Sequence, residues 1–595
     1  MTDDNKPILR REEYRAQQAA QRKKKRLYKS QSRHDEQVVV EIPDDVQMVK
    51  EQEPLQASQT NKSTQDKMIS GSIWMTAGSV FSRVIGAIYI IPWLIWMGSN
   101  GNLANALYAK AYQVYSIFLV ISTAGVPGAI SKQVAHYNAL NEYEIGQRLY
   151  RHGLIMMSLM GIVSMLIMYI GAPVFAVGSP QLMQIFRSLS WALLIIPILS
   201  ITRGFFQGYS EMAPSALSQF IEQVARVIYM LVTCYLIMRV FKGNYVDAVA
   251  QSTFAAFIGA SAGLLLLIFY YLRHLNYFVD VAQHSKQKVK ISTNQILLSI
   301  IQQAVPYIIM DAGISIFYLV DQYTFNPIML TVRHFSKDTL DSLFALFAFN
   351  ANKLIMIIVS LATAMAITAT PLLSAAFTKN NTKVIGKQVN DMLQLFLFVM
   401  VPAAIGLSAV ADPVYTIFYG HGPLGISVLK LSAYVAIILG LYTVMAAILQ
   451  ALYKNRSAIW CLVVGFIVKV VCQFPAIHLF EVYGPLVATA LGFIVSSLLM
   501  LRVVIHTYHI NMVQTLKRLL AIIIFSVAMF IVTWGSIKIM QLFLNPNSRI
   551  NAMIMLIIAV ILGASVYVYC VLKTRLADQI LGKKIARLRR LLRIN

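Results

Sequence analysis

Residues 153–175 read GLIMMSLMGIVSMLIMYIGAPVF, an uninterrupted run of apolar and small residues without a charged side chain. The hydrocarbon core of a bilayer is about 30 Å thick, and a helix crosses it with about 20 residues. Water is absent there, so a segment must satisfy its own backbone N–H and C=O groups, as a helix does. Since apolar and polar residues do not alternate, the run predicts a membrane-spanning helix rather than a barrel strand.

Runs of this kind recur along the chain, separated by short polar stretches. Hydrophobic residues make up 57% of the sequence, charged residues only 13%, and the mean hydropathy is +0.62, which excludes an ordinary soluble globular protein. The pattern predicts an all-α polytopic membrane protein with about 14 transmembrane helices. The predicted spans are residues 70–97, 105–130, 153–175, 184–202, 215–238, 247–271, 296–321, 343–376, 391–418, 426–452, 457–478, 484–501, 519–542 and 550–572.

The net charge of +25 follows the predicted topology rather than the pattern of a nucleic-acid-binding surface. Most of the 51 Lys and Arg lie in the two tails and in loops on the tails' side, and those in the opposite loops are Arg239, Lys242, Arg333, Lys337 and Arg549. By the positive-inside rule, this asymmetry predicts a multi-pass protein of the bacterial cell membrane with both termini in the cytoplasm. The basic tails are expected to attract anionic lipid headgroups, and no nucleic-acid partner is expected.

The spans and tails divide the chain into four predicted parts. Residues 1–67 form a basic cytoplasmic tail, expected to be disordered and lacking the apolar core of a cleavable signal peptide. Residues 68–321 hold helices one to seven, which are the N-terminal lobe and the first helix of the second lobe, and residues 322–572 hold the other helices of the C-terminal lobe. Residues 573–595 place leucine and isoleucine helically among arginines, which predicts a basic amphipathic cytoplasmic tail.

Enzymatic motifs are missing from the short loops between the spans. None of DxD, HxxxH, GxSxG or a P-loop occurs at a suitable position, and we interpret Asp338 and Asp341 as solvated residues of the longest outer loop, 322–342. The cysteines have neither disulfide nor metal spacing, and we interpret them as small apolar residues: Cys234, Cys461, Cys472 and Cys570. The sequence therefore favours a protein that is not an enzyme and needs no metal or cofactor, with coupling to the membrane potential or to a cation left open.

A faint repeat relates the two halves of the chain. Gln207 and Arg226 are 19 residues apart, as are Gln450 and Lys469. Each pair brackets a short loop on the basic side and the span that follows it. Together with the even number of spans, the repeat predicts two pseudo-symmetric lobes around a central cavity, a design common in transporters.

Polar residues inside the spans form stripes on single helix faces. A charge in the membrane is costly, so each one needs a partner or a wet cavity. Asp311 lies alone in the middle of the seventh span. The three stripes are Ser72, Thr76, Ser79 and Arg83; Gln219, Glu222, Gln223 and Arg226; and Asn350, Lys353 and Ser360.

The charges in these stripes have two interpretations. Glu222 and Arg226, spaced i and i+4, either neutralise each other or line a cavity. Arg83 and Lys353 have no acidic residue within one turn, so we expect them to line a solvated central cavity. Guanidinium and ammonium groups bind phosphate well, which favours an anionic cargo. Four other lysines are interpreted as snorkelling side chains or loop-end residues: Lys110, Lys430, Lys469 and Lys538.

Three strings carry a resemblance to a known family. The first, GSIWMTAGSVFSRVIGAIYIIP at 71–92, resembles the first helix of flippases of the MOP (MATE/polysaccharide flippase) superfamily, and its SRVIG core is similar to that of MurJ-type lipid II flippases. ANKLIMIIVSLATAMAITATPLLSAAF at 351–377 resembles their eighth helix. The third string, RGFFQGYSEMAPSALSQFIEQVARV at 203–227, resembles the connection between the fourth and fifth helices in polysaccharide biosynthesis proteins of the YtgP/SpoVB branch.

The resemblance implies a two-lobed bundle that carries a sugar–diphosphate–polyprenol from the inner to the outer leaflet by alternating access. It implies that Arg83 and Lys353 bind the diphosphate. We expect other polar residues to line or gate the cavity, namely Asp311, Glu222, Arg226 and Ser79. We expect helix bending at small and helix-breaking residues, namely Gly125, Pro127 and Pro371.

The sequence departs from the MurJ-type pattern at two places. Tyr89 stands where that type has a second arginine, and the second helix carries Gly125-Val-Pro127 without an arginine. These departures make the predicted cavity less basic, so the identity of the headgroup stays open. The cargo is expected to be lipid II, the peptidoglycan precursor, and the alternative is another lipid-linked glycan such as a teichoic-acid or capsule unit. A MATE-like cation-coupled drug exporter and a non-transporting scaffold for other cell-wall synthesis proteins are the remaining alternatives.

Overall fold

The computed structural model describes residues 85–581 except for 87, 124–125, 140, 210, 284–292, 379–381 and 509–511. All of these residues belong to one compact unit, Ser63–Asn595. The predicted N-terminal tail, Ser79, Arg83, Gly125 and residues 582–595 lie outside the described residues. Every regular element in the described part is a helix, as the sequence predicts.

The first half of the described chain contains the helices α3 Ile90–Met97, η1 Gly98–Asn100, α4 Gly101–Thr123, α5 Val126–Ala139, α6 Tyr143–Ile170, α7 Ala172–Phe175, α8 Pro180–Gly208, α9 Met212–Tyr235, η2 Leu236–Val240, α10 Tyr245–Arg273, α11 Leu275–Gln283 and α12 Thr293–Val332. The second half contains α13 Lys337–Ala345, η3 Leu346–Ala351, α14 Asn352–Thr378, α15 Thr382–Ala409, α16 Ala411–Tyr419, α17 Pro423–Ala451, α18 Asn455–Phe480, η4 Glu481–Tyr483, α19 Gly484–Tyr508, α20 Val513–Met540, α21 Arg549–Lys573 and α22 Leu576–Leu581. Of the short elements, η2 and η3 are π-helical.

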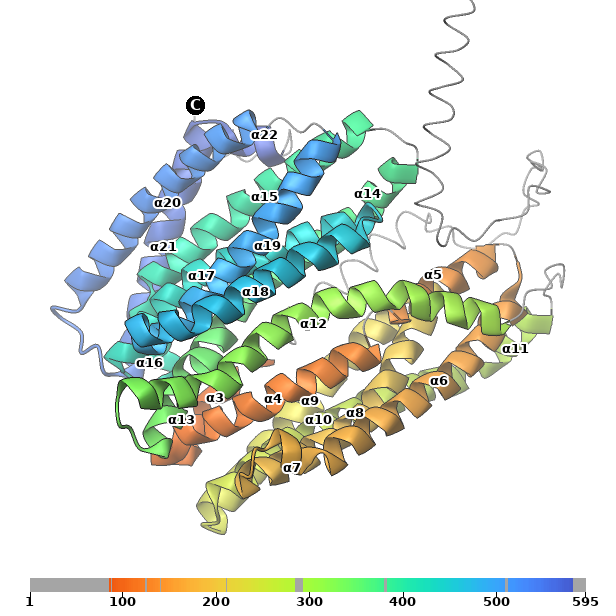
Figure 1. The fold of residues 1–595 in the computed structure, drawn as a ribbon, viewed down its shortest axis with the longest axis horizontal. Helices are drawn as coiled ribbons and strands as arrows, with labels where there is room; N and C mark the ends of the chain where they lie inside the picture. The colour runs from red at the N-terminus through yellow and green to blue at the C-terminus, as the bar shows by residue number, and fades with distance from the viewer. Residues whose placement is uncertain are drawn as a thin grey trace, which may run out of the picture. The chain divides into compact units, whose positions relative to one another are not determined.

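The helices pack in two groups (Figure 1). In the N-terminal lobe, α8 contacts α4, α5, α6 and α10, and α10 also contacts α9. In the C-terminal lobe, α17 contacts α14, α15 and α19, while α20 packs between α15 and α21. We call the end of the bundle where α13 lies the α13 end, and the opposite end, where α5 and α11 lie, the α5 end.

Helix α12 joins the two lobes, because it contacts α4 of the first and α18 of the second. The predicted boundary at residue 321 falls inside this helix, which continues to Val332. Most of the predicted outer loop 322–342 is helical, because it consists of the last turns of α12 and the start of α13. Phe325 explains the extension, since its buried ring packs on Phe344 and Phe347 with centroids 6.2 and 5.1 Å away.

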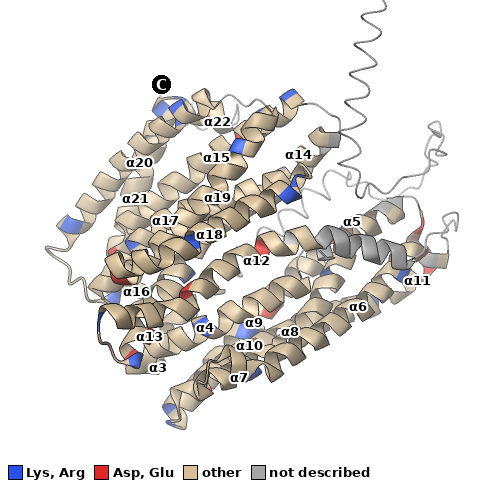
Figure 2. Cartoon of the chain, viewed as in Figure 1, with Lys and Arg blue, Asp and Glu red and all other residues tan. Residues whose placement is uncertain are grey.

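The exterior of the bundle matches a membrane environment. Ten helical stretches among the described residues are long and apolar enough to cross a bilayer, and one of them, Asn455–Tyr508, contains both α18 and α19. Large apolar side chains on the outer helices α20 and α21 are exposed, for example Ile531 and Ile561. Charged residues are sparse along the helices (Figure 2). The chain is thus a multi-pass helical membrane protein, while the count of fourteen spans stays a prediction.

Close helix packing in the C-terminal lobe depends on a glycine. A Cβ atom added to Gly492 of α19 would lie 2.7 Å from the Gly465 carbonyl oxygen of α18 and 2.7 Å from a ring carbon of Phe317 in α12. Small residues allow helix backbones to approach in this way, and the approach supplies packing energy that the hydrophobic effect cannot supply within lipid. Gly492 therefore fixes the spacing of three helices.

Replacing Gly492 with alanine is expected to destabilise the protein by about 1–3 kcal/mol, because the added methyl group must push α18 and α12 away. Thermal unfolding of the detergent-solubilised protein measures this as a lower melting temperature. Gly535→Ala in α20 is the matched control, since its Cβ would meet nothing within 4 Å. Alanine favours a helix over glycine, so the control should melt at or slightly above the wild-type temperature. Equal melting temperatures for Gly492→Ala and wild type would contradict the prediction.

Candidate functional site

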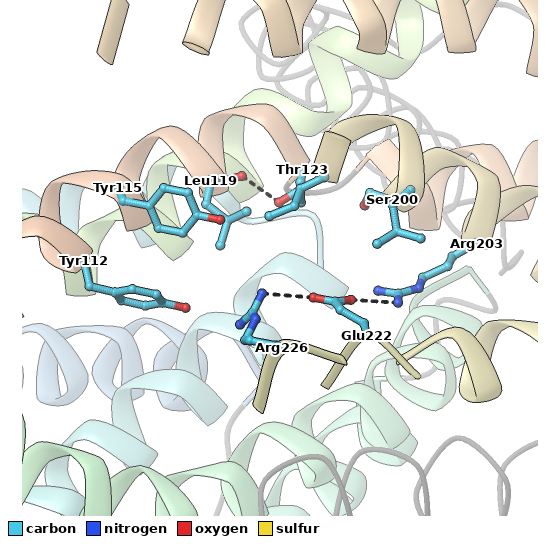
Figure 3. Close-up of a pocket in the computed structure, with 10 residues that line it drawn as sticks. Tyr112, Tyr115, Leu119, Thr123, Ser200, Arg203, Glu222 and Arg226 are labelled. Atoms are coloured by element: carbon cyan, nitrogen blue, oxygen red, sulfur yellow. Dashed lines mark hydrogen bonds and ion pairs between the residues drawn. The ribbon is translucent and has the colours of Figure 1, made fainter. Parts of the chain in front are cut away.

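A cavity of about 240 Å³ lies inside the N-terminal lobe, between α4, α8 and α9 (Figure 3). Two of the predicted site residues, Glu222 and Arg226, line it. The complete lining is Tyr112, Tyr115, Leu119, Thr123, Ile196, Leu199, Ser200, Arg203, Glu222 and Arg226. We call this space the N-lobe cavity.

The charged wall of the N-lobe cavity consists of two arginines that share one carboxylate. Arg226 donates to Glu222 Oε1 at 3.1 Å, as the i, i+4 spacing allows, and Arg203 of α8 donates to Glu222 Oε2 at 2.8 Å. Arg203 Nε also donates to the Ser218 hydroxyl at 2.7 Å. The interpretation of Glu222 and Arg226 as a neutral pair is therefore incomplete, because the cluster of three keeps one excess positive charge.

Glycines on α10 bring this cluster together. A Cβ atom added to Gly259 would lie 2.6 Å from the Glu222 carbonyl oxygen and 2.9 Å from Arg226 Cβ, and one at Gly263 would lie 3.0 Å from the Ser218 carbonyl oxygen. The GASAG sequence at 259–263 is a small-xxx-small motif, which permits close approach of α9 and α10. The side of α9 that bears Glu222 and Arg226 is thereby held against its neighbour.

Helix α4 presents a row of tyrosines between the N-lobe cavity and the C-terminal lobe. Tyr108, Tyr112 and Tyr115 are spaced i, i+4 and i+7, so they share one helix face. The ring centroids of Tyr108 and Tyr112 are 5.8 Å apart, and those of Tyr112 and Tyr115 are 5.3 Å apart. The Tyr108 ring packs edge-on against Phe349, with ring centroids 5.4 Å apart. The row therefore reaches from the N-lobe cavity to the π-helical turn that precedes Lys353.

Lys353 of α14 has no carboxylate partner among the described residues. Its Nζ atom lies 3.5 Å from the Tyr89 hydroxyl and 5.3 Å from the centroid of the Tyr89 ring. Tyr89 thus supplies a phenol oxygen and an aromatic face, which stabilise an ammonium group without cancelling its charge. Lys353 lies near the middle of the helical stretch Lys337–Ala366, where a charge is costly unless it is solvated or bound.

The other predicted site residues are placed as follows. Asp311 lies on α12 with an exposed side chain and has no ion pair or hydrogen bond within the described part of the chain, and it does not line the N-lobe cavity. Gly86, three residues after Arg83 in the sequence, lies beside α9, since a Cβ there would be 3.1 Å from the Gln223 side-chain nitrogen. Pro127 is in the first turn of α5, and Pro371 lies within α14.

The structure corrects the interpretation of Lys469 as a snorkelling side chain or loop-end residue. It is completely buried between α12, α18 and α19. Its ammonium group donates to Asp321 Oδ1 at 2.5 Å, the Thr489 hydroxyl at 2.8 Å and the Pro485 carbonyl oxygen at 3.1 Å. Gln473 donates to Asp321 Oδ1 at 2.9 Å. The side chain cannot reach the membrane surface because Asp321 holds it inside the lobe.

The structure also corrects the interpretation of Lys110 as a snorkelling side chain and of Asp341 as a solvated loop residue. Asp341 is buried on α13 rather than solvated in a loop, and it accepts from Lys110 Nζ at 2.5 Å and from the Asn326 amide at 2.9 Å. A second polar contact lies close by, where the Asn105 amide donates to Asn350 at 2.7 Å and Asn350 donates to the Tyr415 hydroxyl at 3.0 Å. These contacts join the two lobes at the α13 end.

Sequence reasoning missed Arg203 and the tyrosine row, although signals for both are present. The i, i+4, i+7 spacing of the tyrosines is visible in the sequence. Arg203 comes four residues before Gln207, the first residue of the internal repeat, but its contact with Glu222 crosses from α8 to α9 and has no local signature.

The chain is similar to known membrane transport proteins in both sequence and fold. Residues 68–377 match the family profile described as polysaccharide biosynthesis protein. The chain is 35% identical over 541 residues to the lipid II flippase MurJ of Bacillus subtilis (strain 168), which covers 87% of this chain and 97% of that protein. Among solved structures, the inward closed conformation of a lipid II flippase MurJ matches with a TM-score of 0.54 at 14% identity, over 86% of this chain and all of that one. An outward-facing MATE family multidrug transporter of the MOP superfamily matches with a TM-score of 0.57 at 14% identity, over 76% and 99% of the two chains.

Breaking the Lys469–Asp321 pair is expected to cost about 3–5 kcal/mol of stability, because removing one partner leaves a buried charge uncompensated. Lys469→Met and Asp321→Leu should each lower the melting temperature of the solubilised protein. The double variant Lys469→Met/Asp321→Leu removes both charges and should melt closer to wild type than Lys469→Met alone. Additive losses in the double variant would mean that the two side chains do not act as a pair.

Proposed function

The chain belongs to the polysaccharide biosynthesis protein family, and we propose that it translocates lipid II, a polyprenyl-diphosphate-linked saccharide, from the inner to the outer leaflet. The relative named as a lipid II flippase is covered over 97% of its length, which supports the same cargo here. The named relatives are a flippase and transporters, so the chain is placed with transporters rather than enzymes.

The observation that carries the proposal is the Lys353 site. Within the described part of the chain, it is an intramembrane cation whose partner is a phenol rather than a carboxylate. A phosphate group would supply the missing negative charge, and Lys binds phosphate as a point charge. Arg83, which resembles the basic residue of the family's first helix, is proposed as the second diphosphate ligand. Asp311 and Ser79 are proposed to line the path.

We place the α5 end and both termini in the cytoplasm, because the excess of Lys and Arg lies on that side in the sequence. The inter-lobe contacts of Lys110 with Asp341 and Asn105 with Asn350 then close the outer end. Alternating access requires these contacts to separate while the lobes approach at the α5 end. Pro127 and Pro371, both toward the α5 end, are proposed to permit the bending.

The membrane potential is proposed as the driving force. A charge moved across 100 mV changes its free energy by ~2.3 kcal/mol, so a doubly charged headgroup gains about 4–5 kcal/mol on leaving an inside-negative cell. A coupling cation is not needed. Carboxylate, hydroxyl and carbonyl oxygens, the ligands that hard cations prefer, surround Lys469, and its ammonium group occupies that position.

Lys353→Gln is expected to reduce outward transport about tenfold or more, since a charge-assisted hydrogen bond contributes about 1.5–3 kcal/mol. The measurement is the lipid II accessible to an externally added lipid II-cleaving enzyme in host cells depleted of the native protein. Wild type should restore exposure, whereas Lys353→Gln and Arg83→Ala should not, at equal protein levels. Lys538→Gln, which removes an exposed lysine that bonds only Gln541 within the described residues, is the control and should restore it.

Four results would redirect the proposal. Full rescue by Lys353→Gln would remove that residue from the binding site. Unchanged lipid II exposure on depletion, with loss of another surface glycan, would assign the cargo to a teichoic-acid or capsule unit. Export of cationic drugs would instead support a MATE-like activity, and loss of wall synthesis that Lys353→Gln fully rescues would support a scaffold.

Transport by the wild-type protein in proteoliposomes is expected to proceed at the same rate in sodium, potassium and choline buffers, provided that the imposed inside-negative potential is held constant. The reason is that the oxygen atoms of Asp321, Thr489 and Pro485, which could otherwise bind a cation, already accept from the Lys469 ammonium group. Removing the potential should slow outward transport in all three buffers. A rate that rises severalfold with sodium at constant potential would show a coupling cation and contradict this prediction.

A further inference from the structure

The N-lobe cavity holds more positive charge and more hydrogen-bond donors than its own residues use. Glu222 is the carboxylate of its wall, and both of its oxygens are taken by Arg203 and Arg226. Arg226 Nε is buried and has no hydrogen-bond partner among the residues that the structure describes. An arginine carries five N–H donors and cannot lose its charge in a protein, so this side chain retains donors for a further acceptor.

Hydroxyl groups add to the unused donors. Tyr112, Tyr115 and Ser200 line the cavity, and none of the three hydroxyls donates to or accepts from a protein group in the described ranges. In Figure 3 the Tyr112 hydroxyl points toward Arg226, on the opposite side from Glu222. Each hydroxyl can donate one hydrogen bond. A spare guanidinium beside several O–H donors is a site for an oxyanion, since a cation would be repelled by the excess positive charge.

The size of the cavity limits what can enter. Its 240 Å³ is below the range of about 300–1,000 Å³ that is typical for drug-sized ligands. It can therefore take one fragment bearing an oxyanion, such as a carboxylate at the end of a peptide, and cannot enclose a whole disaccharide.

The tyrosine row lies between this cavity and the segment that leads into Lys353. Tyr108 packs on Phe349, four residues before Lys353, and Tyr115 lines the N-lobe cavity. Seven residues of α-helix advance about 10 Å along the axis. The row therefore extends along α4 from the N-lobe cavity toward the helix that carries Lys353, and its neutral aromatic rings offer faces on which a sugar can stack.

We propose that the N-lobe cavity is a second oxyanion site, which binds a carboxylate on the headgroup of the cargo while Lys353 binds its diphosphate. This proposal rests on the proposed function and adds a selectivity to it. A lipid-linked glycan with a headgroup carboxylate is favoured over one without, and Arg226 with Tyr112 makes the distinction.

Binding of fluorescent lipid-linked cargo to the full-length protein in detergent tests this proposal. The probes are lipid II with free peptide carboxylates, the same molecule with those carboxylates amidated, and undecaprenyl diphosphate without a headgroup. Wild type should bind the free carboxylate form about tenfold or more tightly than the amidated form. Arg226→Gln should abolish this difference and leave the affinity for the amidated form and for undecaprenyl diphosphate unchanged.

Two further variants separate binding from folding. Arg226→Lys keeps the charge and should retain part of the preference, and Tyr112→Phe removes one donor and should reduce it severalfold without changing the melting temperature. Equal affinity of wild type for the free and amidated forms would overturn the proposal. An equal loss for all three probes in Arg226→Gln would overturn it as well, because the cluster would then hold the diphosphate. Failure of wild type to bind any lipid-linked probe would instead overturn the proposed function.

Discussion

The cost of removing a charge from water governs how this bundle is built. Three cations inside the helical stretches are each held by a carboxylate from another helix: Lys110 by Asp341, Arg203 by Glu222 and Lys469 by Asp321. A buried charge without such a partner would destabilise the fold by several kcal/mol. Lys353 differs from these residues because it faces the Tyr89 phenol. The requirement that buried charges be paired therefore separates these three cations, which have a carboxylate partner, from Lys353, for which we propose the diphosphate of the cargo as the partner.

The two lobes use the same structural device at corresponding places. Arg226 on α9 and Lys469 on α18 occupy equivalent positions of the internal repeat, and each is the cation of an ion pair with a carboxylate. In each lobe the next helix approaches at a glycine. A Cβ atom added to Gly259 would lie 2.9 Å from the Arg226 Cβ, and one added to Gly492 would lie 3.0 Å from the Lys469 Cβ. The lobes differ in charge balance. In the C-terminal lobe Asp321 pairs with one cation, Lys469. In the N-terminal lobe Glu222 pairs with two, Arg203 and Arg226, and these three residues line the N-lobe cavity.

Hydropathy predicted the long apolar helices of the described part, because each apolar run must satisfy its backbone within itself. It predicted no helix for residues 322–342, where Phe325 packs on Phe344 of α13 although the segment contains charges. The charge partners were predictable only at short range. Glu222 and Arg226 are one turn apart, whereas Lys469 and Asp321 are 148 residues apart, and no pattern in a single sequence links them. Lys353 was found as a candidate because the sequence shows no acidic neighbour, which the described structure also shows. Arg83 and Ser79 lie outside the described residues and stay predictions.

The seam between the lobes at the α13 end is built from amides, a phenol and an ion pair between Lys110 and Asp341. Water can replace every one of these bonds when the seam parts, so each neutral bond contributes only about 1 kcal/mol net to keeping it shut and the ion pair about 1.5–3 kcal/mol. A difference of a few kcal/mol leaves the minor conformation populated at roughly 0.1–10% by thermal motion alone. The alternation of the lobes that we propose therefore needs no motor. A bound cargo would then act by changing the relative populations of the two orientations, so binding and release of the cargo would set the direction of each step.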